Sequence, residues 1–331
     1  MNNIFRLAQV FWAYKQGREK LPYKPLRLWI EPTNHCNLRC QMCPHGEKDA
    51  ELDKGFMEID LFKRLVQEAS GFGADVNLFM GGESLLHPRI NEMIAYCKSQ
   101  GVPSRLYTNA TLLNDEKSEE IIKAGLDHIT FSFDGTDKTS YEAYRKGAGF
   151  DKTLENVRRF LDKKKTVRGR KPYVVIQSME FQEHSDQRIS KAEFKKMFDR
   201  KMVNRFTFIE PHSFAGVYKA DPVKKQARRY SPCAFLWYSM SISWDGTVVP
   251  CCIDLFKKYP VGNAGDHELK ELWNSKAMIN LRSEIYHGRH KEIALCSPCD
   301  VLWKSRIFGI PARSLYNFVE MIASFLSSSR K

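Results

Sequence analysis

The sequence lacks any uninterrupted run of about 18 apolar residues, which is roughly the length that a membrane-spanning helix needs. It also lacks a convincing secretory signal, because the apolar stretch at residues 7–14 is short and has no small-residue cleavage site. We find no internal repeat and no low-complexity tract in the 331 residues, of which 43% are apolar. These features exclude a membrane-spanning, fibrous or disordered chain, and we expect a cytoplasmic protein of about two domains.

Acidic residues are the minority among the charged ones. Asp and Glu number 39 against 52 Lys and Arg, which gives a formal net charge of +13. A basic excess favours anionic partners such as phosphate-bearing substrates, nucleic acid or an acidic membrane face, although a solvated basic surface explains it equally well. The basic residues are spread out, apart from clusters such as Lys163–Lys165 and Lys224–Arg229.

The nine cysteines are odd in number and fall mostly into two groups. A disulfide framework belongs to small secreted chains, and this chain is large and has no secretory signal. We therefore expect metal or redox chemistry at the two groups. Cys97 stands apart among apolar residues of a predicted helix, and we expect a buried core thiol there.

Short apolar runs alternate with helical patterns over about 190 residues of the chain. This alternation predicts parallel strands connected by helices, in a sheet that is either open or closed as a barrel. Helices are predicted between the strands, for example at 59–69 and 88–99. The predicted strands are residues 26–31, 76–80, 104–107, 128–133, 173–179 and 205–209. Polar residues and glycines follow these strands, at the edge that carries the active site in barrel enzymes.

Four segments are predicted along the chain. Residues 1–25 form an N-terminal amphipathic helix, and 26–215 form the strand–helix core. Residues 216–301 form a smaller cysteine-bearing domain with short helices at 269–274 and 278–285 and a β-hairpin at 241–251, turning at Asp245-Gly246. Residues 302–331 form a second amphipathic helix. The two terminal helices pack against the body or lie on a membrane surface, so peripheral membrane contact stays open as an alternative.

The first cysteine group lies in the loop after the first predicted strand. Cys36, Cys40 and Cys43 have the spacing C-x3-C-x2-C, and three thiolates on one short loop hold three corners of a [4Fe–4S] cluster and leave one iron open. A zinc site with His35 or His45 as fourth ligand is the alternative. Gly81-Gly82-Glu83 ends the next strand, where glycines permit close backbone approach and Glu83 accepts from an ammonium group.

The combined motif resembles that of the radical S-adenosylmethionine (SAM) superfamily, over about residues 26–301. The resemblance implies a partial (β/α)6 TIM-like barrel with the [4Fe–4S] cluster at its C-terminal face, held by Cys36, Cys40 and Cys43. It implies that the open iron binds SAM, that reductive cleavage yields a 5′-deoxyadenosyl radical, and that activity requires anaerobic conditions and a flavodoxin- or ferredoxin-type reductant. The residues that it implies for SAM contacts are Gly81, Gly82, Glu83, Asn109, Ser132 and Arg145, the last as the partner of the SAM carboxylate.

The second cysteine group comprises Cys233, Cys251, Cys296 and Cys299. Cys296-Ser-Pro-Cys299 alone fits zinc or a redox pair, and four thiolates also complete a cubane. The sequence around these cysteines resembles the small α+β auxiliary-cluster domain of SPASM and Twitch enzymes. Only five cysteines follow residue 200, which favours one auxiliary [4Fe–4S] cluster, as in the Twitch type, with Cys252 as spare or substitute for Cys251. The spacing resembles that of the butirosin-pathway radical SAM dehydrogenase and, more distantly, of anaerobic sulfatase-maturating enzymes.

A radical SAM oxidoreductase is the function that this resemblance implies. The auxiliary cluster would accept an electron, so the net reaction is a two-electron oxidation of a polar small molecule: a sugar, a cyclitol or a nucleotide-linked sugar. The alternatives are a peptide-modifying enzyme, an enzyme acting on a membrane lipid or lipid-linked glycan, and a non-catalytic iron–sulfur or zinc protein that binds nucleic acid. The intact SAM-binding pattern argues against the last of these, so we expect no nucleic-acid partner. A base is needed for the substrate proton, and the candidates that follow the fifth and sixth strands are Glu180, His184, Glu210 and His212.

Overall fold

The computed structural model describes residues 3–46, 51–167, 171–181, 189–218, 229–304, 306–307 and 310–311. Its centre is a nine-stranded sheet in the order β10-β9-β8-β1-β2-β3-β4-β5-β6, with every pair from β1 to β6 parallel. These six strands are β1 (Arg27–Ile30), β2 (Asp75–Leu78), β3 (Ser104–Thr108), β4 (His128–Ser132), β5 (Tyr173–Met179) and β6 (Arg205–Ile209). The predicted α/β fold with a parallel sheet is confirmed, and the predicted strand ends agree within two residues.

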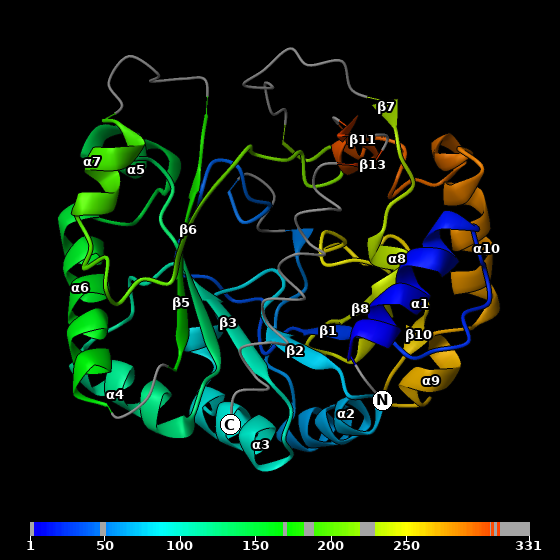
Figure 1. The fold of residues 1–331 in the computed structure, drawn as a ribbon, viewed down its shortest axis with the longest axis horizontal. Helices are drawn as coiled ribbons and strands as arrows, with labels where there is room; N and C mark the ends of the chain where they lie inside the picture. Colours follow the sequence, from blue (N-terminus) through cyan, green and yellow to red (C-terminus); the bar gives the residue numbers. More distant parts are fainter. Residues whose placement is uncertain are drawn as a thin grey trace.

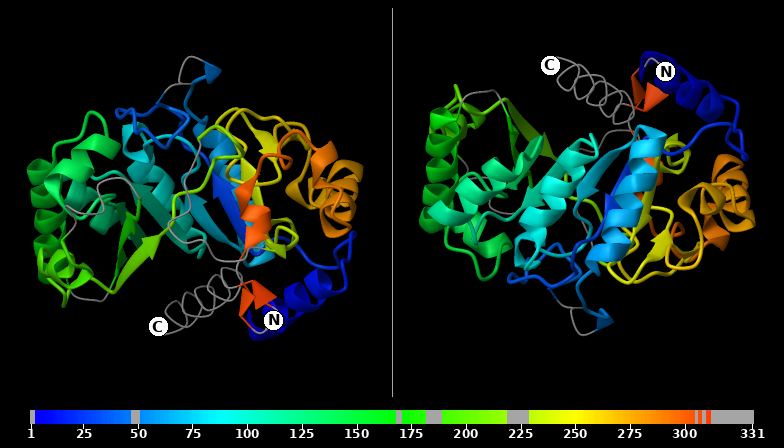
Figure 2. Two further views of the ribbon diagram at one scale, coloured as in Figure 1. Left: turned by 90° about the horizontal axis from the view of Figure 1, so that it is seen from above. Right: turned by 90° about the horizontal axis from the view of Figure 1, so that it is seen from below.

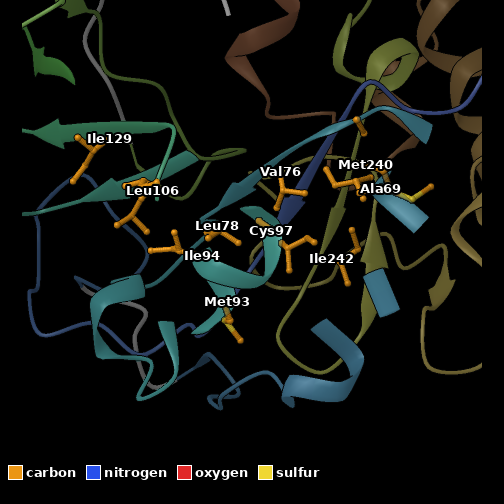
Figure 3. Close-up of a cluster of buried hydrophobic side chains, with 14 of the residues drawn as sticks. Ala69, Val76, Leu78, Met93, Ile94, Cys97, Leu106, Ile129, Met240 and Ile242 are labelled. Atoms are coloured by element: carbon orange, nitrogen blue, oxygen red, sulfur yellow. The ribbon is translucent and has the colours of Figure 1, made fainter. Parts of the chain in front are cut away.

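Helices connect the parallel strands and cover the outer side of the sheet (Figure 1). They are α2 (Ile59–Phe72), α3 (Ile90–Ser99), α4 (Asp115–Ala124), α5 (Lys138–Tyr144), α6 (Phe150–Thr166) and α7 (Lys191–Lys196), with a short 3-10 helix, η2 (Ser84–Leu86). Alternate strand residues pack against them. Val76, Leu78 and Leu106 lie beside Met93, Ile94 and Cys97 of α3 in one buried cluster (Figure 3). Cys97 is fully buried, as predicted.

The cysteine-bearing region continues the same sheet rather than forming a separate one. β8 (Ser239–Ile242) runs parallel to β1, with Trp29 opposite Ser241, and β9 (Thr247–Val249) and β10 (Gly262–Asn263) extend the edge in antiparallel fashion. The predicted hairpin is present, but the prediction of a two-residue turn at Asp245-Gly246 is wrong. The loop spans 243–246 and is closed by Ser243 N donating to Thr247 O, because Gly246 adopts a positive φ of 85° and its N–H bonds to Ser243 O.

Short helices surround this extension at the right of Figure 1. They are α8 (Phe235–Tyr238), α9 (Leu269–Leu272), α10 (Lys276–Tyr286), η4 (His290–Glu292) and η5 (Asp300–Leu302). Two pairings of two-residue strands complete the described elements: β7 (Arg229–Tyr230) with β11 (Trp303–Lys304), and β12 (Arg306–Ile307) with β13 (Ile310–Pro311).

The N-terminal helix α1 (Asn3–Lys15) lies beside the helices of the cysteine-bearing region (Figure 2). Leu7, Val10 and Ala13 are buried, and the hydroxyl of Tyr14 donates to the carbonyl of Pro232 at 3.1 Å. The N-terminal helix therefore packs against the body through these side chains, and it ends at Lys15 rather than at the predicted residue 25. Most of the predicted C-terminal helix, from residue 312 on, lies outside the described residues. None of the helices in the described part of the chain combines the length and the hydropathy that a bilayer crossing requires.

Candidate functional site

The loop that carries the first cysteine group follows β1 and is held by hydrogen bonds to two neighbouring segments. Glu83 N donates to the carbonyl of His35 at 2.8 Å, so the Gly-Gly-Glu segment after β2 is attached to the loop. Gly82 is the closest point, because a Cβ there would lie 2.4 Å from Thr33 O and 2.6 Å from His35 O. On another side, Arg39 N and Gln41 N donate to the carbonyls of Lys146 and Tyr144 at the end of α5.

The three thiols of this loop lie near one another and near a buried cation. Cys36, Cys40 and Cys43 each have a pKa above the usual value because burial disfavours the thiolate. Neighbouring thiols add to the effect at Cys36 and Cys43, and the carboxylates of Asp134 and Glu83 add to it at Cys40. Burial raises the pKa of Cys36 to about 11 and that of Cys43 to about 12. The positive charge of Arg145 acts in the opposite direction on all three.

Arg145 itself is paired within the chain. Its Nε and Nη2 donate to Oδ2 of Asp134 at 3.1 and 2.6 Å, and both side chains are buried. Burial opposes the charge of Arg145, but Asp134 and Cys40 raise its pKa above the usual value. Sequence analysis singled out Arg145; Asp134 is one of the polar residues that follow the strands, and the sequence assigned it no role.

The other predicted SAM contacts surround the same loop. Glu83 is 2% exposed and accepts from Thr108 Oγ1, Asn109 N and Leu85 N at 2.8–3.1 Å. Burial raises the pKa of Glu83. The amide of Asn109 donates to Asn37 Oδ1 in the cysteine loop at 3.0 Å, so this side chain connects β3 to the loop. Ser132 is half-buried at the end of β4.

The second cysteine group is also brought together by the fold. Cys251 lies near Cys233, Cys252 and Cys299, and Cys296 lies near Cys233 and Cys299, closely enough for each thiol to raise a neighbour's pKa. Burial is the larger cause for both Cys251 and Cys296. In the part of the chain that the structure describes, no three His, Cys, Asp or Glu side chains are arranged to hold one metal ion.

Both thiol groups fit iron–sulfur clusters by the chemistry of their donors. Buried thiols that disfavour one another's ionisation need a polycationic core to become ligands, and iron–sulfur clusters take thiolate ligands. The first group supplies three thiols, and the second supplies the predicted four together with Cys252.

The inner face of the sheet has an aromatic part and a polar part. Strand alternation places Trp29 and Tyr107 on the face opposite the core cluster, and with Phe79 they form a half-buried group whose ring centroids are 5.3–6.4 Å apart. Across β4, β5 and β6, Ser132, Gln177 and Thr207 are register partners. The inner face therefore offers apolar ring surface on one side and polar groups on the other.

A charged group closes the opposite end of this face. Asp75 accepts from Arg27 Nε and Nη2 at 2.8 and 2.7 Å and from Arg105 Nε at 3.1 Å. Burial raises the pKa of Asp75, but the two arginines outweigh it and bring the value to about 2. His128 is buried beside them with its ring 5.2 Å from that of Tyr173. These side chains start β1 to β5, far along each strand from the cysteine loop, and sequence analysis did not identify them.

The four candidate bases lie in different environments. Glu180 forms an ion pair with Lys191 at 2.8 Å, and Glu210 is exposed after β6. His212 Nδ1 accepts from Phe214 N at 3.2 Å, and its ring lies 4.1 Å from that of Phe214. His184 lies outside the described residues.

Glu31 is a buried acidic residue that sequence analysis missed. It directly follows β1, is 2% exposed, and accepts from the backbone of Gly81 and Trp244. A charged residue at the end of an apolar strand, five positions before the first cysteine, was the available signal.

Comparison with protein families identifies two segments of the chain. Residues 30–184 match the model described as "Radical SAM superfamily", and residues 233–300 match SPASM, described as "Iron-sulfur cluster-binding domain". Among curated proteins, the tungsten-containing aldehyde ferredoxin oxidoreductase cofactor-modifying protein of Pyrococcus furiosus is 26% identical over 75% of this chain and 81% of its own. The Fe-coproporphyrin III synthase of Methanosarcina barkeri is 30% identical over 40% of this chain, which corresponds to only 33% of that protein.

Solved structures show the same fold. BtrN in complex with AdoMet and 2-DOIA aligns over 83% of this chain and 92% of its own, with a TM-score of 0.56 and 16% identity. Streptococcus suis SuiB bound to precursor peptide SuiA aligns over 86% and 73%, with a TM-score of 0.65 and 17% identity. Native anSMEcpe with bound AdoMet aligns over 92% and 99%, with a TM-score of 0.59 and 17% identity. The predicted combination of a radical SAM partial barrel with a C-terminal auxiliary-cluster domain is confirmed.

Proposed function

We propose that this chain, which combines a radical SAM domain with a SPASM domain, catalyses a net two-electron oxidation of a small polar molecule. A radical SAM domain uses a [4Fe–4S] cluster and SAM, and a SPASM domain carries auxiliary iron–sulfur clusters. The substrate class that we propose is a sugar, a cyclitol or a nucleotide-linked sugar. A flavodoxin- or ferredoxin-type protein is the proposed reductant.

In this proposal each cysteine group holds one iron–sulfur cluster. Cys36, Cys40 and Cys43 hold the first cluster, and a single auxiliary cluster is held by Cys233, Cys251, Cys296 and Cys299. When bound, SAM and the first cluster supply a 5′-deoxyadenosyl radical that removes one hydrogen atom from the substrate, and the auxiliary cluster supplies an acceptor for the remaining electron. The residues proposed to contact SAM are Gly81, Gly82, Glu83, Asn109, Ser132 and Arg145.

The chain's own residues orient the reactants and remove one proton. The proton goes to Glu180, Glu210, His184 or His212, the groups that follow β5 and β6. Of these groups, Glu180 forms an ion pair with Lys191 of α7. The Arg145–Asp134 pair keeps a guanidinium next to the thiols of the first loop without an uncompensated buried charge.

The observation that carries the small-molecule proposal is the composition of the inner face. Half-buried Trp29, Phe79 and Tyr107 offer ring surface against which the C–H face of a sugar or cyclitol packs. The row of Ser132, Gln177 and Thr207 offers hydrogen-bonding groups across the sheet. A molecule with an apolar ring face and several hydroxyls complements both parts.

The test is anaerobic reconstitution with iron and sulfide, followed by iron counting and an assay for 5′-deoxyadenosine from SAM and dithionite. About eight irons per chain and measurable 5′-deoxyadenosine support two clusters and a radical enzyme. About four irons with cleavage remove the auxiliary cluster from the proposal. Bound zinc without cleavage contradicts the radical mechanism.

Peptide modification is the second candidate, favoured by one comparison. PqqA peptide cyclase of Gluconobacter oxydans is 32% identical over 115 residues, which are 34% of this chain and 31% of that protein. Ultrafiltration of a cell extract separates the two candidates. Stimulation of 5′-deoxyadenosine formation by the small-molecule filtrate supports oxidation of a metabolite, whereas stimulation by the peptide fraction alone supports peptide modification.

A further inference from the structure

The carboxyl group of Glu31 is buried between two segments that belong to the two matched domains. Oε1 accepts from Gly81 N at 3.0 Å, and Oε2 accepts from Trp244 N at 3.3 Å. Gly81 lies in the segment after β2, and Trp244 lies in the turn between β8 and β9. The charged groups that face Glu31 are Lys257 and Asp245.

On the Gly81 side, the carboxylate occupies the place that a side chain would take. A Cβ on Gly81 would lie 2.9 Å from Glu31 Oε1. The next residue, Gly82, is pressed against the backbone of residues 33–35, as described above. The position of the Gly-Gly-Glu segment therefore depends on where the Glu31 carboxylate lies.

On the Trp244 side, the same carboxylate meets a turn that is fastened at several points. The indole N–H of Trp244 donates to Asp53 O at 3.2 Å, and Lys257 lies 5.4 Å from the centroid of its ring while pairing with Asp245. From this turn β9 leads to Val249, two residues before Cys251. A shift of the turn is therefore transmitted along β9 towards the second cysteine group.

We propose that Glu31 is a positioning residue whose two carboxylate oxygens couple SAM binding at the Gly81–Glu83 segment to the β8–β9 turn of the SPASM domain. This inference rests on the proposed function for the assignment of SAM to Gly81–Glu83. One oxygen accepts from Gly81 N and the other from Trp244 N. Displacement of either segment therefore moves the Glu31 carboxylate, which is hydrogen-bonded to the other segment. Coupling between sites is reciprocal, and SAM binding must then alter the turn.

The protonation of Glu31 should make SAM affinity depend on pH, which is not expected of a residue with a purely structural role. Burial raises its pKa to about 7, although the N–H groups of Gly81 and Trp244 and the charge of Lys257 lower it, while Asp245 raises it. Above that pH both oxygens accept. Below it one oxygen carries a proton and loses its bond to an N–H, so SAM affinity falls as the pH falls through about 7.

The experiment combines hydrogen exchange with SAM binding on the reconstituted protein under anaerobic conditions. In the wild type, SAM is expected to slow amide exchange in peptides covering 243–246. In Glu31→Gln the side-chain N–H2 faces one of the two N–H donors, so this effect is expected to disappear and the SAM dissociation constant to rise about tenfold in equilibrium dialysis. Glu116→Gln on the exposed side of α4 is the matched control and leaves both quantities unchanged.

The outcomes separate this inference from the proposed function. SAM that binds and is cleaved without changing exchange at 243–246 in the wild type overturns the coupling and leaves the enzyme intact. Failure of the wild type to bind or cleave SAM overturns the proposed function instead.

If Glu31→Gln does not fold, Glu31→Asp keeps the charge but is one methylene too short to reach both N–H groups, and the same loss of coupling is expected. If the SAM affinity of Glu31→Gln still falls as the pH falls through about 7, the role of this carboxyl group is contradicted.

Discussion

Nη2 of Arg145 lies 2.6 Å from Oδ2 of Asp134, and the two side chains are 9% and 1% exposed. Arg145 follows α5 and Asp134 follows β4, so the pair connects a helix end to a strand end beside the first cysteine loop. Asp134 Oδ1 also accepts from Met179 N at 2.9 Å, which extends the connection to β5. One buried carboxylate thus holds three elements around the thiols.

Replacement of Asp134 is expected to destabilise the protein strongly. Asp134→Asn leaves the buried Arg145 without a compensating charge, and we expect a loss of about 3 kcal/mol in the free energy of unfolding. The matched control is Asp151→Asn, which removes the exposed Lys138–Asp151 pair of the same 2.6 Å length. Guanidinium unfolding curves compare them, and equal midpoints for the two variants would contradict the structural importance of the buried pair.

Substitution of Gly82 is expected to disrupt the first cluster. An alanine Cβ meets the backbone carbonyls of Thr33 and His35, and backbone atoms move less readily than a flexible side chain. We expect Gly82→Ala to lose about four irons per chain. Gly71→Ala, in α2 with nothing within 4 Å of the added Cβ, is the control and is expected to keep full iron content and to be slightly more stable. Normal iron content in Gly82→Ala would refute the close approach.

The three thiols of the first loop should be indispensable for SAM cleavage. Single alanine substitutions of Cys36, Cys40 or Cys43 remove one of three ligands, and we expect loss of about four irons and of 5′-deoxyadenosine formation. Cys97→Ala is the matched control, because its thiol is fully buried in the core between α3 and the sheet. Its iron content should equal that of the wild type even though it melts at a lower temperature.

The choice between Cys251 and Cys252 is open to a direct test. Cys251 lies near Cys233 and Cys299, whereas Cys252 packs against the small cluster of Leu52, Met80, Val249 and Leu255. We expect Cys251→Ser to lose about four irons while retaining the electron paramagnetic resonance signal of the SAM-binding cluster, and Cys252→Ser to retain about eight. The reverse pattern would exchange the two assignments.

His128 is expected to make the protein sensitive to mild acid. Burial, with the nearby Arg105, lowers its pKa to about 3, below the unfolded value of about 6.5. Between these values the unfolded chain binds more protons, so stability falls as the pH is lowered through this window. From pH 7 to pH 5.5 the difference amounts to about 1 kcal/mol.

His128→Gln should flatten that pH dependence relative to the wild type. His267→Gln, on the exposed surface of the cysteine-bearing region, should leave it unchanged. Unfolding midpoints at the two pH values measure the effect. An equal pH dependence in wild type and His128→Gln would show that this imidazole does not stay neutral in the folded protein.

Local patterns were sufficient to predict the strands, the helices between them and several residues that the fold gathers around the first cysteine loop. β5 and β6 have the predicted bounds, because their alternating or apolar character is a property of neighbouring residues. Glu83 and Asn109 were identified because they follow strands, and the fold brings both to the cysteine loop. The hairpin loop was misjudged, since Asp245-Gly246 also suits the four-residue turn that the chain adopts.

The sequence by itself determined the motifs and the fold class: seven cysteines in two spacings, a Gly-Gly-Glu after a strand, and the alternation that builds a parallel sheet. Only the tertiary structure decided the partners. β8 joins β1, Arg145 meets Asp134, and Glu31 meets Trp244 across 213 positions of the chain. The physical reason is that spacing and alternation are set by adjacent residues, whereas a buried charge or N–H takes whatever complementary group chain folding brings within about 3 Å.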